Sequence, residues 1–232
     1  MYTYLLINLG VISFPLLRSF ENKIRFFSRW KALLPAIMLP MVLFILWDAV
    51  FTSKGIWGFN PDFLLGVQLL GLPLGEWLFF ITVPYACLFI HEVLRNYFPQ
   101  PLPARPYQML ARILGGTLIL LGVFLYPRMY PFVTFLLAGL CLIAVASSSL
   151  SSGLGAFFRT YLICWIPFLL VNGLLTGTGL GAEVVWYNEE EIIGWRILTI
   201  PVEDGVYMLL LLLSNISIYE WLRPEKERVR AA

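Results

Sequence analysis

Long apolar runs alternate with short polar segments along the whole chain. A hydrocarbon core about 30 Å thick is crossed by a helix of roughly 20 mostly apolar residues, and lipid offers the open edge of a sheet no hydrogen-bond partner. The runs are continuous, unlike the alternating strands of a membrane barrel. The pattern therefore predicts seven transmembrane helices, at residues 1–17, 32–50, 74–94, 108–126, 130–148, 158–176 and 198–222.

Composition supports an all-α polytopic membrane protein. Of the 232 residues, 59% are hydrophobic and 13% are charged, whereas a soluble domain carries about 25% charged residues. The first apolar run lacks a cationic start and a small-residue cleavage site, so we interpret it as a span and not as a signal peptide. The three cysteines lie inside apolar runs and have neither a disulfide framework nor metal-ligand spacing.

The basic residues predict the orientation in the membrane. If the N-terminus is outside, the cytoplasmic segments carry every basic residue except Lys54, Arg128 and Arg196. Such a bias is what the positive-inside rule expects. We therefore expect an integral protein of the cell (inner) membrane with a cytoplasmic C-terminus, whose last basic residues are Arg223, Lys226, Arg228 and Arg230.

An internal repeat organises the chain. Five identical or similar residue pairs lie 128 positions apart: Asn60 and Asn188, Pro73 and Pro201, Glu76 and Asp204, Glu92 and Glu220, Arg95 and Arg223. Self-similarity at a fixed offset indicates a duplication. It predicts tandem parallel three-helix repeats, residues 1–106 and 128–232, joined by a linker helix in residues 107–127. Upstream of these asparagines the two copies align if one copy is four residues longer. In that alignment Asn172 corresponds to Asp48.

Carboxyl groups inside these helices are the candidates for chemistry. An ionisable side chain in a membrane helix is costly and marks a functional site by default. Glu76 and Asp48 stand among aromatic residues, and the second repeat offers Glu203 and Asp204. These four acids are the predicted catalytic residues. The alternative for Glu76 is that it only complements the helix dipole, a contribution of about 0.3–1 kcal/mol.

Other ionisable residues suggest structure. Glu92 precedes Arg95 by three positions, as Glu220 precedes Arg223, and each spacing predicts an ion pair within one helix. The single histidine, His91, has no partners for a metal site or a catalytic triad. No nucleotide-binding motif is present, and no lysine lies in a span, which excludes a retinal Schiff base. We expect no metal and no cofactor.

Acids beside aromatic rings fit one kind of chemistry. A carboxyl group kept from water retains its proton near neutral pH and can act as a general acid, and ring faces stabilise a developing carbocation. This combination suits the protonation of an isoprenoid double bond. Seven residues near the acids are the predicted substrate-binding residues: Trp57, Asn60, Trp77, Phe80, Asn172, Asn188 and Tyr207.

Four segments resemble the small integral-membrane lycopene cyclase family, which occurs as two short subunits, as fused chains and as the cyclase part of fungal bifunctional enzymes. They are Trp47-Asp48, residues 55–60, Pro73-Leu74-Gly75-Glu76 and Pro201-Val202-Glu203-Asp204. The family usually has paired acids after the proline, whereas the first copy here has Gly75-Glu76. The resemblance implies a redox-neutral lycopene beta-cyclase that converts the linear ψ-ends of lycopene to β-rings. In that reaction Glu76 or an acid of the second repeat would donate a proton and Asp48 would remove one.

The same residues are compatible with three other functions. A carotenoid hydratase would use the same protonation and add water, a proton-coupled carrier would use membrane acids without chemistry, and a structural subunit would do neither. The expected partners are lycopene or a related linear carotenoid, membrane lipid and other carotenoid enzymes, with no nucleic acid.

Overall fold

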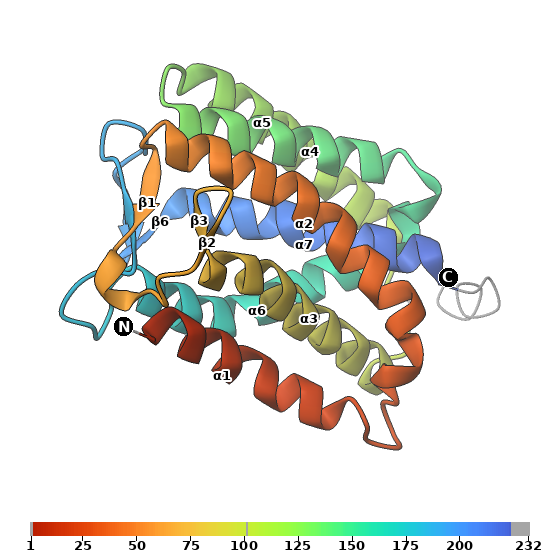
Figure 1. Cartoon of the computed structure of the whole chain (residues 1–232). Coiled ribbons are helices and arrows are strands. Elements are labelled where there is room, and N and C mark those ends of the chain that lie inside the picture. Colours follow the sequence, from red (N-terminus) through yellow and green to blue (C-terminus); the bar gives the residue numbers. More distant parts are fainter. Residues whose placement is uncertain (1, 101, 224–232) are drawn as a thin grey trace.

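In the residues that the structure describes, the protein is a bundle of seven α-helices (Figure 1). The computed structural model describes residues 2–100 and 102–223, so Lys226, Arg228 and Arg230 lie outside the described residues. Within these limits each predicted span corresponds to one helix. The helices are α1 (Thr3–Arg18), α2 (Trp30–Ser53), α3 (Leu74–Tyr97), α4 (Ala104–Phe124), α5 (Met129–Ala146), α6 (Leu154–Leu175) and α7 (Val202–Leu222). Three short 3₁₀ helices join them: η1 (Phe26–Arg29), η2 (Pro61–Phe63) and η3 (Ser149–Gly153).

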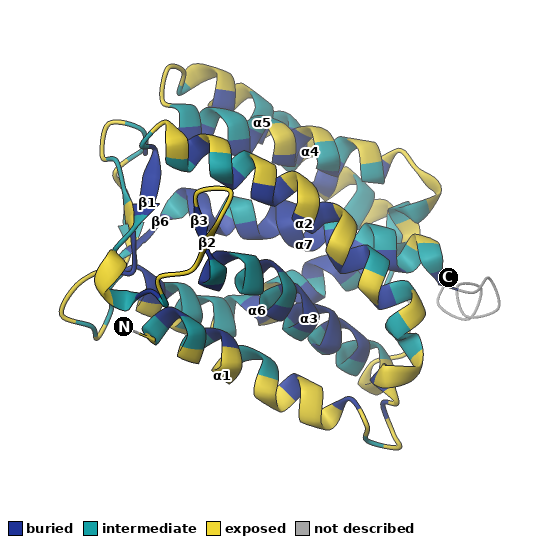
Figure 2. Ribbon diagram, viewed as in Figure 1, coloured by how far each residue is buried: buried dark blue, intermediate teal, exposed yellow. Residues whose placement is uncertain are grey.

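Helix length and surface character agree with a membrane protein. Six helical segments of the described chain are long and apolar enough to cross a membrane, and α1 is a shorter apolar helix of 16 residues, about 24 Å long. Large apolar side chains face outward, among them Leu17, Leu120 and Phe124 at 76%, 73% and 83% exposure. Figure 2 shows exposed positions along α1 and mostly buried positions along α7. The chain is therefore an all-α polytopic membrane protein.

Six short strands gather at one end of the bundle, which we call the strand end (Figure 1). β1 (Trp57–Phe59) pairs antiparallel with β4 (Val185–Tyr187). Two small hairpins precede α3 and α7: β2 (Gln68–Leu69) with β3 (Leu72–Pro73), and β5 (Arg196–Ile197) with β6 (Ile200–Pro201). The apolar pattern did not predict these strands, because each has only two or three residues.

The offset of 128 residues recurs in the backbone of the strand end. β1 and β4 pair about their central residues, Gly58 opposite Trp186, which are 128 positions apart. The hairpin pairs Gln68 with Pro73 as it pairs Arg196 with Pro201. Each hairpin also turns through a leucine with positive φ, Leu70 at 52° and Leu198 at 58°, and α3 and α7 begin after equivalent prolines. The two segments thus fold alike and meet through their equivalent strands.

At the opposite end of the bundle, ion pairs join α3 to the end of α7. Arg223 Nη1 donates to Glu92 Oε1 at 2.6 Å, and Arg95 donates to Glu220. Glu92 also pairs with Arg29, at 3.0 Å. The predicted pair between Glu92 and Arg95 is therefore wrong, whereas the pair between Glu220 and Arg223 is present at 3.3 Å. Each of these two glutamates therefore lies closer to an arginine from the neighbouring helix than to the arginine three positions along its own chain.

His91 is a structural member of the same region. Its Nδ1 lies 2.8 Å from Thr160 Oγ1, and its Nε2 lies 3.1 Å from Glu220 Oε1. The ring is 1% exposed, so it joins α3 to α6 and α7 inside the bundle. Together with these ion pairs, this hydrogen-bonded histidine fixes the relative positions of three helices at the end opposite the strands.

Candidate active site

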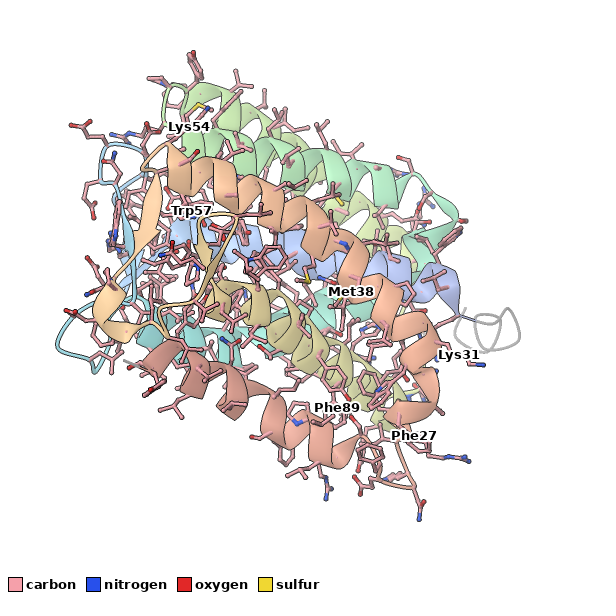
Figure 3. All side chains as sticks on the ribbon, in the orientation of Figure 1. Phe27, Lys31, Met38, Lys54, Trp57 and Phe89 are labelled. Atoms are coloured by element: carbon pink, nitrogen blue, oxygen red, sulfur yellow. The ribbon has the colours of Figure 1, made fainter. Side chains whose placement is uncertain are left out.

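A cavity of about 430 Å³ opens inside the bundle beneath the strand end. Helices α1, α3, α6 and α7 form its walls, and β1 and β4 cover it. Figure 3 labels two of its lining residues, Trp57 near the strand end and Phe89 far along α3 toward the other end. Two of the prolines inside helices, Pro15 and Pro167, line the cavity, whereas Pro40 and Pro84 lie elsewhere in the core.

Three carboxyl groups meet at the covered end of this cavity. Asp48 comes from the last turns of α2, Glu76 from the first turn of α3 and Asp204 from the first turn of α7. Their exposures are 2%, 8% and 4%. All three carboxyl groups line the same cavity. The fold therefore brings together three acids that are widely separated in the sequence and withholds them from water.

Each acid receives a different set of hydrogen bonds. Asp204 accepts three, from Tyr130 at 2.6 Å, from Tyr187 at 2.8 Å and from Asn172 at 2.6 Å. Glu76 accepts one from the Tyr4 hydroxyl, and Asp48 Oδ1 accepts one from the Trp57 indole. Asp48 Oδ2 is buried without a partner among the described residues. Three donors stabilise a carboxylate anion at Asp204, while Asp48 keeps one oxygen for a proton or a ligand.

The phenol of Tyr187 stays a donor over the ordinary pH range. This residue belongs to β4, outside the helices, and its side chain faces Asp204. Burial, and then the negative charge of Asp204, raises the pKa of Tyr187 well above its usual value of 10.0. The hydroxyl hydrogen is therefore held toward Asp204, which keeps that carboxylate oriented.

Aromatic rings surround the acids. Tyr130 stacks on Tyr187 with ring centroids 5.8 Å apart, and Trp57 meets Tyr130 edge to face at 5.0 Å. Tyr207 lies 6.3 Å from Trp57. These rings belong to four different elements, and all of them line the cavity. Their faces supply negative electrostatic potential next to the acids, which favours a cation in this space.

Six of the predicted site residues line the cavity: Asp48, Glu76, Asp204, Trp57, Asn172 and Tyr207. Glu203, next to Asp204, points elsewhere, since neighbours on a helix diverge by about 100°. It is fully buried and accepts a hydrogen bond from the Ile193 amide. The structure thus distinguishes the two adjacent acids: only Asp204 faces the cavity.

The other predicted binding residues lie outside the cavity lining. Asn60 and Asn188 accept hydrogen bonds from the amides two residues on, each at 3.1 Å, and so stabilise turns. The Trp77 indole donates to the Leu69 carbonyl at 3.1 Å. Phe80 is 1% exposed and packs in the core. These four residues shape the strand end and the helix packing without facing the acids.

Three tyrosines at the acids were missed by the sequence analysis. Tyr4 and Tyr130 stand near the starts of α1 and α5, the first helices of the two predicted repeats, and Tyr187 ends β4. A comparison of the repeats that allowed a shift of two residues would have paired Tyr4 with Tyr130. For Tyr187 no such signal exists, because its contact with Asp204 depends on how β4 crosses the bundle.

Equivalent positions of the two predicted repeats carry different side chains around the cavity. At the offset that relates Asp48 to Asn172, Val171 corresponds to Trp47, and Tyr207 corresponds to Phe79 at the longer offset. Val171 and Phe79 line the cavity. At the corresponding positions Trp47 and Tyr207, the two rings pack together with their centroids 5.1 Å apart. A valine therefore lines the cavity at the position where the other predicted repeat has a tryptophan packed against Tyr207.

A comparison with known families identifies the chain. The sequence model described as "Lycopene cyclase" matches residues 1–94 and 127–222, most of the chain. The chain belongs to the lycopene cyclase family. This membership supports a carotenoid cyclase function and implies a linear carotenoid substrate. The first matched segment covers α1, α2 and most of α3, the second covers α5–α7, and α4 lies between them. No curated protein and no solved structure matches the chain.

Proposed function

We propose that this lycopene cyclase family member converts the linear ends of lycopene to β-rings by acid catalysis inside the membrane. The single observation that supports the proposal most is the meeting of Asp48, Glu76 and Asp204 in one covered, aromatic cavity. Substrate, proton donor and cation-stabilising groups would share this space. The reaction would take place without water, which would otherwise capture the cation.

In the proposed mechanism, Glu76 and Asp48 exchange one proton with the substrate. Two neighbouring carboxyl groups in an apolar site do not ionise together, so the pair holds a proton. Glu76 adds it to the terminal double bond of the ψ-end, and a tertiary cation forms. The neighbouring double bond attacks this cation and closes the six-membered ring. Asp48, through its unpartnered Oδ2, then removes a ring proton. One proton enters and one leaves, so the reaction is redox-neutral.

Asp204 has a different role in this proposal. Its carboxylate is held by three donors, which makes it a fixed negative charge rather than a mobile base. A preorganised charge of this kind stabilises a positive transition state without rearranging. The rings of Trp57, Tyr130 and Tyr207 add to the same effect.

The proposal includes the orientation and the domain organisation. We infer that the strand end faces outward from the cell membrane and that α7 ends on the cytoplasmic side, because the basic residues are concentrated there. We also propose that residues 1–106 and 128–232 are the two repeat domains and that residues 107–127 form the linker helix. The position of α4 between the two matched segments supports this division.

Replacement of Glu76 by Gln tests the function. The amide keeps the size of the side chain and an acceptor for Tyr4 but holds no acidic proton. We expect cyclised product in a lycopene-making host to fall by roughly 10²- to 10⁴-fold, the usual contribution of a general acid. Glu190→Gln, at an exposed loop position of the strand end, is the matched control and should retain activity.

The products of the parent chain separate the alternatives. A cyclised carotenoid has the mass of lycopene, a hydrated one is heavier by one water, and a carrier leaves lycopene unchanged. Purified protein should therefore be incubated with lycopene in liposomes without an ion gradient. Full activity of Glu76→Gln would refute the role of Glu76, and a hydrated product would replace the cyclase proposal with a hydratase.

A further inference from the structure

The cavity continues well beyond the acids. Along α3 its lining extends from Glu76 to Ile90, a distance of roughly 21 Å at 1.5 Å per residue. Past the acids and their hydrogen-bond partners, the lining side chains of α1, α3 and α6 are apolar, with Cys87 and Cys164 among them. The cavity is thus a long apolar slot with its reactive groups at one end.

The slot is shorter than the proposed substrate. A linear carotenoid is an extended C40 polyene, and such a chain is longer than the slot. When one end of the molecule reaches Glu76, part of its length must therefore leave the protein. The part that leaves is hydrocarbon, so it requires an apolar exit.

The covered end offers no such exit. The acids are at most 8% exposed, and the cover residues Trp57 and Val185 are 5% and 9% exposed. The side of the slot along α1 is different. Gly10 and Phe14 line the cavity and are also exposed on the outer face of the bundle, Phe14 at 64%. A Cβ added at Gly10 would meet no atom within 4 Å. The slot therefore opens sideways at α1, toward lipid.

The far wall of this opening is helix α6. Its cavity-lining residues Pro167, Phe168 and Val171 are partly exposed, and Ile166 beside them is 64% exposed. Pro167 also lacks the backbone N–H of an ordinary helical residue, so this part of α6 is a weak point of the helix. Apolar surface is thus continuous from the outside of the bundle to the acids.

We infer that a linear polyene enters sideways from the lipid between α1 and α6, with its end at the acids and the remainder of its chain leaving past Gly10 and Phe14. The inference rests on the proposed function for the identity of the ligand. It adds an entry path and a binding mode: one arm of the carotenoid is enclosed along α3 while the other arm stays in the bilayer.

Gly10→Trp closes the opening in the test. Each variant is purified in detergent from lycopene-making cells, and total carotenoid per protein, linear plus cyclised, is measured by absorbance. We expect Gly10→Trp to retain no more than about one tenth of the carotenoid that the parent retains. A tenfold loss corresponds to a change of about 1.4 kcal/mol in the free energy of binding. Gly116→Trp is the matched control, because Gly116 lies inside α4 with equally open space around its Cβ and away from the cavity.

A second pair of variants keeps the test decisive if Gly10→Trp does not fold. Cys87 lines the slot 11 residues beyond Glu76, about 16 Å along the helix, whereas Cys141 on α5 does not line it. Cys87→Phe should lose carotenoid as Gly10→Trp does, and Cys141→Phe should keep it. The inference is overturned if Gly10→Trp or Cys87→Phe folds and retains as much carotenoid as its control.

Failure of the inference can be told apart from failure of the proposed function. A parent chain that retains carotenoid and loses it with Gly10→Trp, but makes no ring, supports the entry path and refutes the cyclase proposal. A parent that cyclises while Gly10→Trp retains carotenoid and activity refutes the entry path alone. A parent that neither retains nor cyclises carotenoid overturns both.

Discussion

The ion pairs between α3 and the end of α7 lead to a quantitative prediction for Glu92→Gln. The Glu92 side chain is 1% exposed and lies between Arg29, at 3.0 Å, and Arg223, at 2.6 Å. Removing one partner of a buried pair costs about 3–5 kcal/mol, because the other charge stays buried. Here Arg223 still has Glu220 at 3.3 Å, and Arg29 is 23% exposed and can reach water. We therefore expect the lower limit, about 3 kcal/mol.

Thermal unfolding of the purified protein in detergent measures this effect. For a chain of this size each kcal/mol shifts the midpoint by about 2–4 °C, so Glu92→Gln should lower it by roughly 6–12 °C. The control is Glu21→Gln, because Glu21 pairs with Arg18 at the surface, with side-chain exposures of 34% and 52%. Exposed pairs contribute about 0–1 kcal/mol, which predicts a shift of at most roughly 4 °C.

A double-mutant cycle decides which arginine is the partner. The structure predicts coupling of Glu92 with Arg223 and of Glu220 with Arg95, each at about 0.5–3 kcal/mol. A pair within one helix would instead couple Glu92 with Arg95. The reasoning is refuted if Glu92→Gln shifts the midpoint no more than Glu21→Gln, or if the larger coupling of Glu92 is with Arg95.

Three further predictions concern the cavity. Trp57→Phe keeps an aromatic ring but removes the hydrogen-bond donor to Asp48. A hydrogen bond to a charged group contributes about 1.5–3 kcal/mol, so turnover should fall by about 10- to 100-fold. Unchanged turnover would show that this donor is dispensable. Asn172→Asp puts a second carboxyl group within hydrogen-bond distance of Asp204 and should lower the midpoint of thermal unfolding at neutral pH. The midpoint should partly recover in acid, where the two carboxyl groups share a proton. Equal midpoints at both pH values would contradict this prediction. Burial raises the pKa of Tyr187 above 10.0, so the unfolded chain loses this proton first and the stability of the fold declines as pH rises beyond about 10. Tyr187→Phe should therefore lose less stability than the parent between pH 8 and pH 11, which is measured as the unfolding midpoint at the two pH values.

The helices were predictable because membrane spans are a property of local composition. Runs such as residues 130–148 are apolar whatever they pack against, and α5 occupies nearly the same range. The strands were not predictable, because β1 is only three residues long and forms through its partner β4, which lies more than 120 positions away. Length and apolarity therefore determined the bundle, while the cover of the cavity depends on tertiary contact.

The acids were predictable for the same local reason, and their partners were not. Asp48, Glu76 and Asp204 stood out as charges in apolar helices, and the cavity contains all three. Tyr4 did not stand out, since a tyrosine near a helix end is ordinary in a membrane protein. Glu92 was assigned to the wrong arginine, because spacing along one helix says nothing of the helix beside it. The sequence thus indicated which groups carry charge, and the fold determines what each of them touches.

Trp47 packs against Tyr207, whereas its counterpart Val171 lines the cavity, and the three acids share one chamber for a molecule with two identical ends. If the proposed function holds, a carotenoid with one closed ring must leave the cavity, reverse its orientation in the bilayer and compete with linear substrate for the same entry path. The one-ring compound would then be a free species in the membrane, and its abundance would rise when starting material is plentiful. The ratio of one-ring to two-ring products would therefore depend on exchange of carotenoids between the cavity and the lipid as much as on the chemistry at the acids.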